Sequence, residues 1–172
     1  IIIDEAYYMF GCTSAISLIN KHKNLIILRS FSKAFGIPSI RLGFIISNQK
    51  NIQLLSTTRL AYESNYLSDT AAIYFLKNIK IIYNYIKQVK KGRDFFKKKI
   101  QQLGFKVIGG KANFLLINFN KTEITKRVYY GLLKKCIYVK GYHQTPLDKC
   151  LLLTCGPKTI MHKVYKEISK II

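Results

Sequence analysis

Short apolar runs that end in polar residues open the chain. Residues 1–5 begin with three isoleucines and end on two carboxylates, which is typical of a buried strand in a parallel sheet. An amphipathic turn at 15–21 leads to a second apolar run at 25–28, and a third run covers 43–47. The link between the first two runs is long enough to join parallel neighbours. We therefore expect Asp4 and the polar residues after 25–28 to face one crevice at the carboxyl ends of these strands.

The pattern then becomes helical and later alternates again. Apolar residues repeat with helical spacing through 49–60 and, without an internal proline, through 68–99, where Gly92 is expected to mark a bend or a boundary. A small α+β unit should follow, with strands at 105–108, 114–119, 137–140 and 151–155 and helices at 123–135 and 158–172. We expect two domains, residues 1–90 and residues 91–172.

Length and composition limit the classes of protein. With 172 residues and 49% hydrophobic content, the chain can bury a substantial core. No apolar stretch approaches the roughly 20 residues of a membrane span, and the first residues lack the features of a signal peptide. We therefore expect a cytoplasmic protein with no membrane partner. The apolar start, without an initiator methionine or a preceding turn, indicates a fragment.

The formal net charge of +21 invites a nucleic-acid interpretation, which the pattern of charges does not favour. The basic residues are mostly dispersed lysines, and no zinc-finger, aromatic RNP or basic-zipper pattern accompanies them. The four cysteines are too scattered for a CxxC site, and the histidines at 22, 143 and 162 lie apart from one another. We expect no metal site.

The stretch around Lys33 holds the candidate chemistry. A lysine just past a buried strand has its charged form disfavoured, which lowers the pKa of the amine and makes it a nucleophile able to form a Schiff base. Ser30, Ser32 and Arg41 supply the hydroxyl and guanidinium donors that bind a phosphate group. A small molecule with both an aldehyde and a phosphate would suit this stretch. Each residue alone also fits an ordinary capping, turn or surface role.

Three motifs together resemble the fold-type I pyridoxal-phosphate-dependent aminotransferases of class I/II, and the histidinol-phosphate aminotransferases in particular. They are Asp4-Glu5-Ala6-Tyr7, the run from Arg29 to Gly36, and the run from Ile40 to Phe44. The resemblance extends over nearly the whole chain. It implies an α/β fold in which the chain forms part of the large domain, with a mainly parallel sheet, and the small α+β C-terminal domain.

The resemblance also implies roles for individual residues. Lys33 would hold pyridoxal 5′-phosphate as a Schiff base and then move a proton between the substrate and the cofactor. Asp4 would pair with the pyridinium nitrogen, keeping it protonated so that the ring accepts electrons. Tyr7 would donate a hydrogen bond to the phenolic oxygen of the cofactor. The phosphate-binding positions are matched by Ser30, Ser32 and Arg41.

The implied reaction moves an amino group from an amino acid or a phosphorylated amine to a 2-oxo acid. The implied full-length protein is a homodimer, and the chain by itself is expected to be inactive. Leu152 stands where the family has an arginine for the substrate anion. Either the substrate lacks that anion, another base such as Lys140 or Lys158 replaces the arginine, or the activity has been lost. The alternatives are a decarboxylase, an aminotransferase of another phosphorylated or phosphonated amine, or an inactive fragment that binds anions or nucleic acid.

Overall fold

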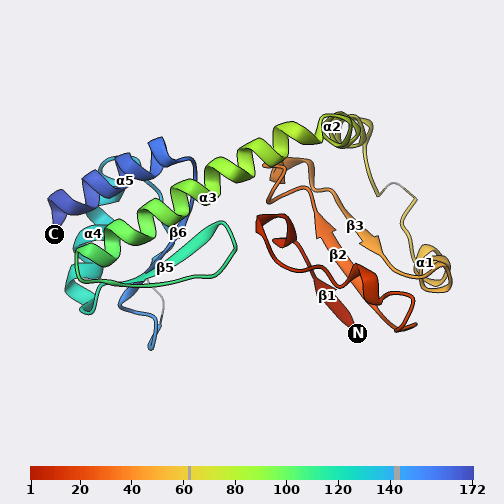
Figure 1. Ribbon diagram of the computed structural model, residues 1–172, viewed down its shortest axis with the longest axis horizontal. Helices are drawn as coiled ribbons and strands as arrows, with labels where there is room; N and C mark the ends of the chain where they lie inside the picture. Colours follow the sequence, from red (N-terminus) through yellow and green to blue (C-terminus); the bar gives the residue numbers. More distant parts are fainter. Residues whose placement is uncertain (62, 142–143) are drawn as a thin grey trace. The chain divides into compact units, whose positions relative to one another are not determined.

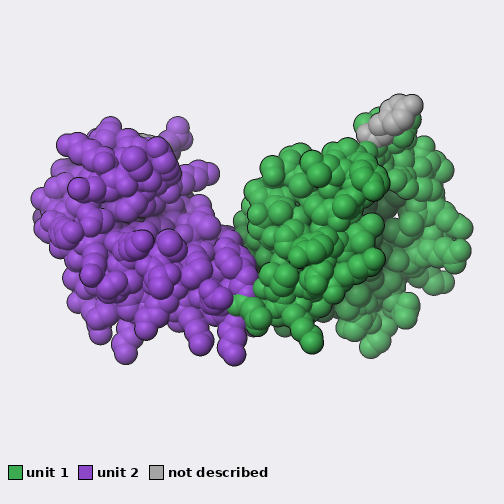
Figure 2. All heavy atoms as spheres, turned by 90° about the horizontal axis from the view of Figure 1, so that it is seen from above, with its two compact units in different colours: residues 1–84 green, residues 85–172 purple. Residues whose placement is uncertain are grey.

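The computed structural model describes residues 1–61, 63–141 and 144–172, so His143 lies outside the described residues. Two compact units, residues 1–84 and residues 85–172, are described separately below (Figure 2). The domain boundary between residues 90 and 91 stays a prediction. Among the described residues, no helix is both long and apolar enough to cross a membrane.

The first unit is built on a sheet of three strands in the order β1-β2-β3 (Figure 1). β1 (Ile2–Asp4) runs parallel to β2 (Ile26–Ser30), and β2 pairs antiparallel with β3 (Gly43–Ile46). The parallel pair with its crossover agrees with the sequence. The sheet within this chain is nevertheless mixed, because the third run returns directly alongside the second.

One face of this sheet carries a small apolar core. Ile19, Leu25 and Ile27 are buried there, and Ile3 and Ile46 pack against them. The expectation that the first strand is buried is wrong for this chain, since Ile1 and Ile2 are each 67% exposed. The reason is position: among the described residues, β1 has a strand partner on one side only.

The predicted long helix exists but is divided. α1 (Gln49–Ser56) is separate, and the run 68–99 lies in α2 (Tyr66–Lys77) and α3 (Ile79–Gln102). The break falls at Asn78, whose backbone N–H and side-chain amide both donate to the Tyr74 carbonyl, at 3.0 and 2.9 Å.

Gly92 does not mark a bend, because α3 continues through it. A Cβ atom at Gly92 would lie 2.0 Å from the Gly156 oxygen and 2.9 Å from the Pro157 carbonyl carbon. The glycine therefore allows α3 to lie directly against the turn that precedes the last helix.

The second unit is a three-stranded antiparallel sheet with helices packed on it. Its strands, in the order β4-β5-β6, are β4 (Lys106–Ile108), β5 (Phe114–Asn118) and β6 (Cys150–Thr154). Its helices are α4 (Thr122–Leu133), α5 (Lys158–Ile171) and most of α3. Leu115 and Ile117 pair with Leu153 and Leu151, and all four side chains are buried.

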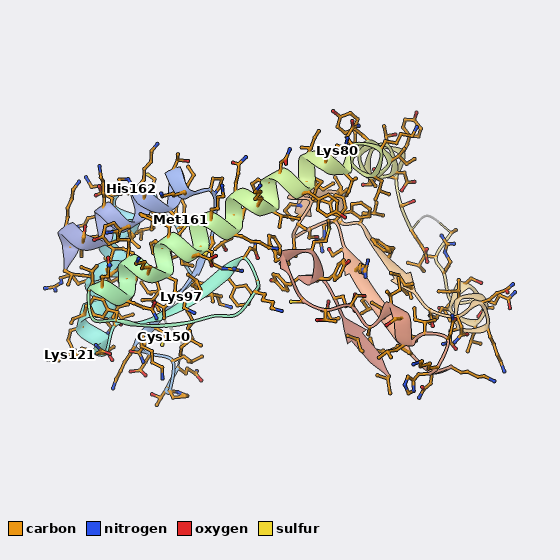
Figure 3. The ribbon with its side chains drawn as sticks, viewed as in Figure 1. Lys80, Lys97, Lys121, Cys150, Met161 and His162 are labelled. Atoms are coloured by element: carbon orange, nitrogen blue, oxygen red, sulfur yellow. The ribbon has the colours of Figure 1, made fainter. Side chains whose placement is uncertain are left out.

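These buried side chains form one core with residues of the three helices. The helical contributors include Phe96 and Ile100 of α3, Val128 and Leu132 of α4, and Met161 and Ile168 of α5. Figure 3 labels Met161 on α5 and Cys150 at the start of β6. Side chains alternate along a strand, so Leu116 and Leu152, which pair with each other and are only half-buried, lie on the other face of the sheet.

The strand predicted at 137–140 is reduced to a single bridge, Lys140 to Leu152. Cys136 has a positive φ of 56°, and the Ile137 N–H bonds back to the Leu132 carbonyl at the end of α4. The chain is still leaving the helix at these residues, so it reaches strand geometry only at Lys140.

Candidate active site

A single pocket of about 380 Å³ in the first unit brings together most of the residues that the sequence singled out. It lies at the carboxyl ends of β1 and β2. Its lining includes Asp4, Ser30, Ser32, Lys33 and Arg41, together with Ala6, Leu28, Arg29 and Pro38. The parallel pairing explains this arrangement. Asp4 of β1 lies beside Leu28 of β2, and both strands lead into loops at the same edge of the sheet.

Asp4 is the last residue of β1, and its carboxylate begins the loop that follows. Its Oδ1 accepts a hydrogen bond from the Ala6 N–H at 2.8 Å, which is an Asx-type turn. Asp4 is exposed, so the carboxylate is open to a ligand.

Ser30 and Lys33 lie at the end of β2 and just beyond it. The Ser32 N–H donates a hydrogen bond to Ser30 Oγ at 3.0 Å, which curls the chain and leaves the Ser30 hydroxyl proton able to donate. Lys33 Nζ lies 5.3 Å from the centre of the Tyr7 ring. Tyr7 is half-buried beside Lys33, although it is not among the residues that line the pocket.

The expectation that Lys33 is buried is wrong for this chain, because Lys33 is exposed. It lies in a turn three residues past β2 and at the side of an open pocket, rather than within the sheet. Lys33 is therefore a candidate because of its neighbours in the pocket and not because of burial.

Arg41 reaches the pocket through an unusual backbone. It ends the short helix Pro38–Ile40 in the left-handed region, with a φ of 52°, and its guanidinium donates to the Pro38 carbonyl at 2.7 Å. The buried Ser68 of α2 holds this turn by donating a hydrogen bond to the Ile40 carbonyl at 2.8 Å. Arg41 thus has a strained backbone conformation, which a hydrogen bond from another helix stabilises. Such strain is typical of residues at ligand-binding sites.

The donor set fits pyridoxal phosphate. A carboxylate suits a pyridinium nitrogen, an amine suits an aldehyde, and two serines with an arginine suit a phosphate. Asp4 lies at the end of one strand, and the phosphate donors lie at and beyond the end of the next. One pocket thus presents the three groups that such a molecule requires. Among the described residues, no three His, Cys, Asp or Glu side chains cluster as a metal site.

The predicted substrate residues lie in the second unit. Lys140 is exposed and pairs with Leu152 on the sheet face away from the helices. Lys158 differs, because its Nζ lies 5.2 Å over the ring of Phe95 on α3, which is on the helical side. Of the two lysines considered for the missing arginine, Lys140 is therefore the one beside Leu152.

The other lysines come from many elements of both units. Lys80 is near the start of α3 and Lys121 precedes α4, and both are exposed (Figure 3).

Sequence reasoning missed a buried ion pair beside the pocket, Glu5 with Arg29. Both residues stand within the quoted motifs, but neither had been assigned a role. The sequence did hold a signal for this pair. An acidic residue directly follows Asp4 and a basic residue directly precedes Ser30, at the ends of two neighbouring strands.

Comparisons with known proteins agree with this geometry. The family model for aminotransferase class I and II matches residues 1–167. The chain is 35% identical over 158 residues to the histidinol-phosphate aminotransferase of Ruminiclostridium cellulolyticum, covering 91% of this chain and 43% of that protein. It is 31% identical over 166 residues to the histidinol-phosphate aminotransferase of Thermotoga neapolitana, covering 96% of this chain and 48% of that protein.

A solved structure matches as well. The histidinol-phosphate aminotransferase from Clostridium acetobutylicum superposes with a TM-score of 0.86 at 26% identity, over 99% of this chain and 53% of that one. The predicted fold class is thereby confirmed. The chain spans about half the length of the relatives it matches.

Proposed function

Because the chain belongs to the class I and II aminotransferases, we propose that it forms the lysine-bearing part of a pyridoxal-phosphate-dependent aminotransferase of the histidinol-phosphate type. The reaction moves an amino group from an amino acid or a phosphorylated amine to a 2-oxo acid. One observation carries the proposal: Asp4, Ser30, Ser32, Lys33 and Arg41 line a single pocket.

The residues of the pocket divide the work. When bound, pyridoxal phosphate supplies an electron sink for the negative charge that develops at the substrate Cα. Ser30, Ser32 and Arg41 bind the phosphate, with the guanidinium as a geometrically specific donor. Asp4 holds a proton on the ring nitrogen by its negative charge.

Lys33 and Tyr7 act at the reacting end. Lys33 Nζ would hold the cofactor, and the same amine is placed to move a proton at the substrate Cα. Tyr7, whose ring centre lies 5.3 Å from Lys33 Nζ, donates a hydrogen bond to the ring oxygen of the cofactor.

Lys140 is the proposed anchor for the substrate anion. A lysine keeps the positive charge of the arginine that Leu152 replaces but offers a point charge instead of a planar fork. This arrangement suits a phosphate or phosphonate, which accepts hydrogen bonds from many directions. The alternatives that Leu152 leaves open are a decarboxylase or an aminotransferase of another phosphorylated or phosphonated amine.

We place this reaction in the cytoplasm and the complete enzyme in a homodimer, as its relatives' class leads us to expect. The experiment uses the whole polypeptide in which residues 1–172 occur. Amino donors with and without a phosphate are incubated with 2-oxoglutarate, and glutamate is measured. We expect glutamate to form with a phosphorylated donor, and no glutamate to form with the Lys33→Ala variant. Loss of a donor's carboxyl group as carbon dioxide, without glutamate, would favour the decarboxylase.

A further inference from the structure

The ion pair of Glu5 and Arg29 lies beside the proposed site and has no part in the chemistry described so far. Glu5 Oε2 accepts from both Arg29 Nε, at 3.2 Å, and the terminal Arg29 nitrogen, at 3.0 Å. The side chains are 5% and 18% exposed. A buried pair of this kind is costly to desolvate and survives only with good geometry and further hydrogen bonds.

Further hydrogen bonds and a ring contact surround the pair. Glu5 also accepts from Ser14 Oγ at 2.9 Å and from the Ala15 N–H at 2.6 Å. Arg29 donates to Ser14 Oγ at 2.8 Å and lies 4.0 Å over the ring of Tyr8. Burial alone would raise the pKa of Glu5, but these hydrogen bonds and the charge of Arg29 outweigh it and lower that pKa. Glu5 is therefore held as a carboxylate.

The place of the pair in the sheet suggests its purpose. Glu5 directly follows Asp4, and Arg29 directly precedes Ser30. The Glu5 N–H also donates to the Leu28 carbonyl at 2.8 Å, which extends the parallel pairing of β1 and β2 to their last residues. The pair thus ties the two strand ends directly beside Asp4 and Ser30, and Arg29 itself lines part of the pocket.

We propose that Glu5 and Arg29 are positioning residues, which set the separation between Asp4 and Ser30 so that one cofactor molecule contacts both. This inference rests on the proposed function. Asp4 binds one end of pyridoxal phosphate and Ser30 the other, so a change in their spacing weakens a ligand that spans both ends. A ligand that uses only the phosphate end is unaffected.

Two probes separate these cases. Pyridoxine 5′-phosphate has the ring and the phosphate but no aldehyde. It cannot form a covalent bond to Lys33, so its affinity reports noncovalent binding alone. Inorganic phosphate uses only the phosphate end. Both dissociation constants are measured by calorimetry on the whole polypeptide that contains residues 1–172, for the wild type, Glu5→Gln and Arg29→Lys. Circular dichroism checks folding.

The matched control is Glu63→Gln, which removes the exposed pair Arg59–Glu63 of the same unit. Glu5→Gln should raise the dissociation constant of pyridoxine 5′-phosphate roughly tenfold, because small displacements of binding groups have large effects on binding. Its affinity for inorganic phosphate should stay within about twofold, and Glu63→Gln should change neither, since exposed pairs contribute little. Arg29→Lys keeps the positive charge but loses the planar guanidinium. Its affinity for pyridoxine 5′-phosphate should therefore lie between those of Glu5→Gln and the wild type.

Three results would overturn the inference. Equal weakening for both probes would indicate general structural damage, and no weakening would show that the pair does not set the spacing. If the wild type binds inorganic phosphate but not pyridoxine 5′-phosphate, the proposed function itself fails, and the inference falls with it.

Discussion

Lys140 and Leu152 exchange both backbone hydrogen bonds: the Lys140 N–H donates to the Leu152 carbonyl at 3.0 Å, and the Leu152 N–H donates back at 2.8 Å. Residues directly opposite each other in an antiparallel pair project their side chains to the same face. The ammonium of Lys140 is therefore expected to project from the same face as Leu152. The proposed function assigns to this lysine the anion-binding role of the arginine that Leu152 would replace.

Replacing Lys140 tests this relationship. Lys140→Met should raise the KM for a phosphorylated amine about tenfold or more, because a hydrogen bond to a charged group contributes roughly 1.5–3 kcal/mol. The turnover number should change less, since the proposal assigns Lys140 to substrate binding and not to the chemical step. Steady-state kinetics in the whole polypeptide measures both quantities. Leu152→Arg in the Lys140→Met background should restore the KM, and Lys134→Met, at an exposed lysine after α4, is the control. An unchanged KM in Lys140→Met would contradict the assignment.

Gly92→Ala should destabilise the second unit. The added Cβ would meet backbone atoms of Gly156 and Pro157, which cannot rotate away. We expect a loss of roughly 1–3 kcal/mol or more in the free energy of unfolding, as for other overpacked contacts. Chemical denaturation measures the change. Gly110→Ala, where a Cβ meets nothing within 4 Å, should stay within about 0.5 kcal/mol of the wild type. Equal stability of the two variants would show that the close contact is not real.

The ion pair predicts a dependence of stability on pH. The pKa of Glu5 is lowered in the folded chain from its ordinary value of 4.5. Its interactions therefore stabilise the native state fully above that value and are lost as the pH falls through the folded pKa. The stability difference between the wild type and Glu5→Gln, measured by urea denaturation from pH 7 downward, should be constant at neutral pH and shrink in acid. A difference that does not change with pH would contradict this account.

The cysteines should differ in reactivity. Burial raises the pKa of Cys155 to about 12, an effect that the charge of Arg93 reduces and that of Asp94 increases. Its thiol stays protonated and unreactive at neutral pH. Cys12 and Cys136 are exposed, whereas Cys150 is buried. A thiol reagent followed by mass spectrometry should modify only the two exposed cysteines in the native protein. Native modification of Cys155 would show that the core around β6 is open.

The element pattern was predictable where local sequence decides it. Apolar runs such as 25–28 and 114–119 became strands at nearly the expected residues, because alternation and chain punctuation are local properties. The absence of a full strand at 137–140 was not predictable. Cys136 has a left-handed backbone conformation, so the chain is still leaving α4 at these residues. The break at Asn78 was not predictable either, because the apolar periodicity continues across it.

The pocket was predictable from motif order, because parallel strands deliver Asp4 and Ser30 to one edge. The exposure of Lys33 was not, since a sequence shows that a strand ends but not what covers its end. Glu5 and Arg29 were overlooked for a related reason. Their opposite charges beside the candidate residues were a signal, but only the register of the two strands shows that they pair.

The most direct test of the central claim is to find which lysine holds the cofactor. The whole polypeptide that contains residues 1–172 is incubated with pyridoxal phosphate, reduced with borohydride and mapped by peptide mass spectrometry, with Lys33→Arg as the control. The account predicts a single dominant label on Lys33, a visible absorbance band before reduction, and loss of both in Lys33→Arg. A label spread evenly over the exposed lysines, or one that leaves Lys33 unmodified, would contradict it.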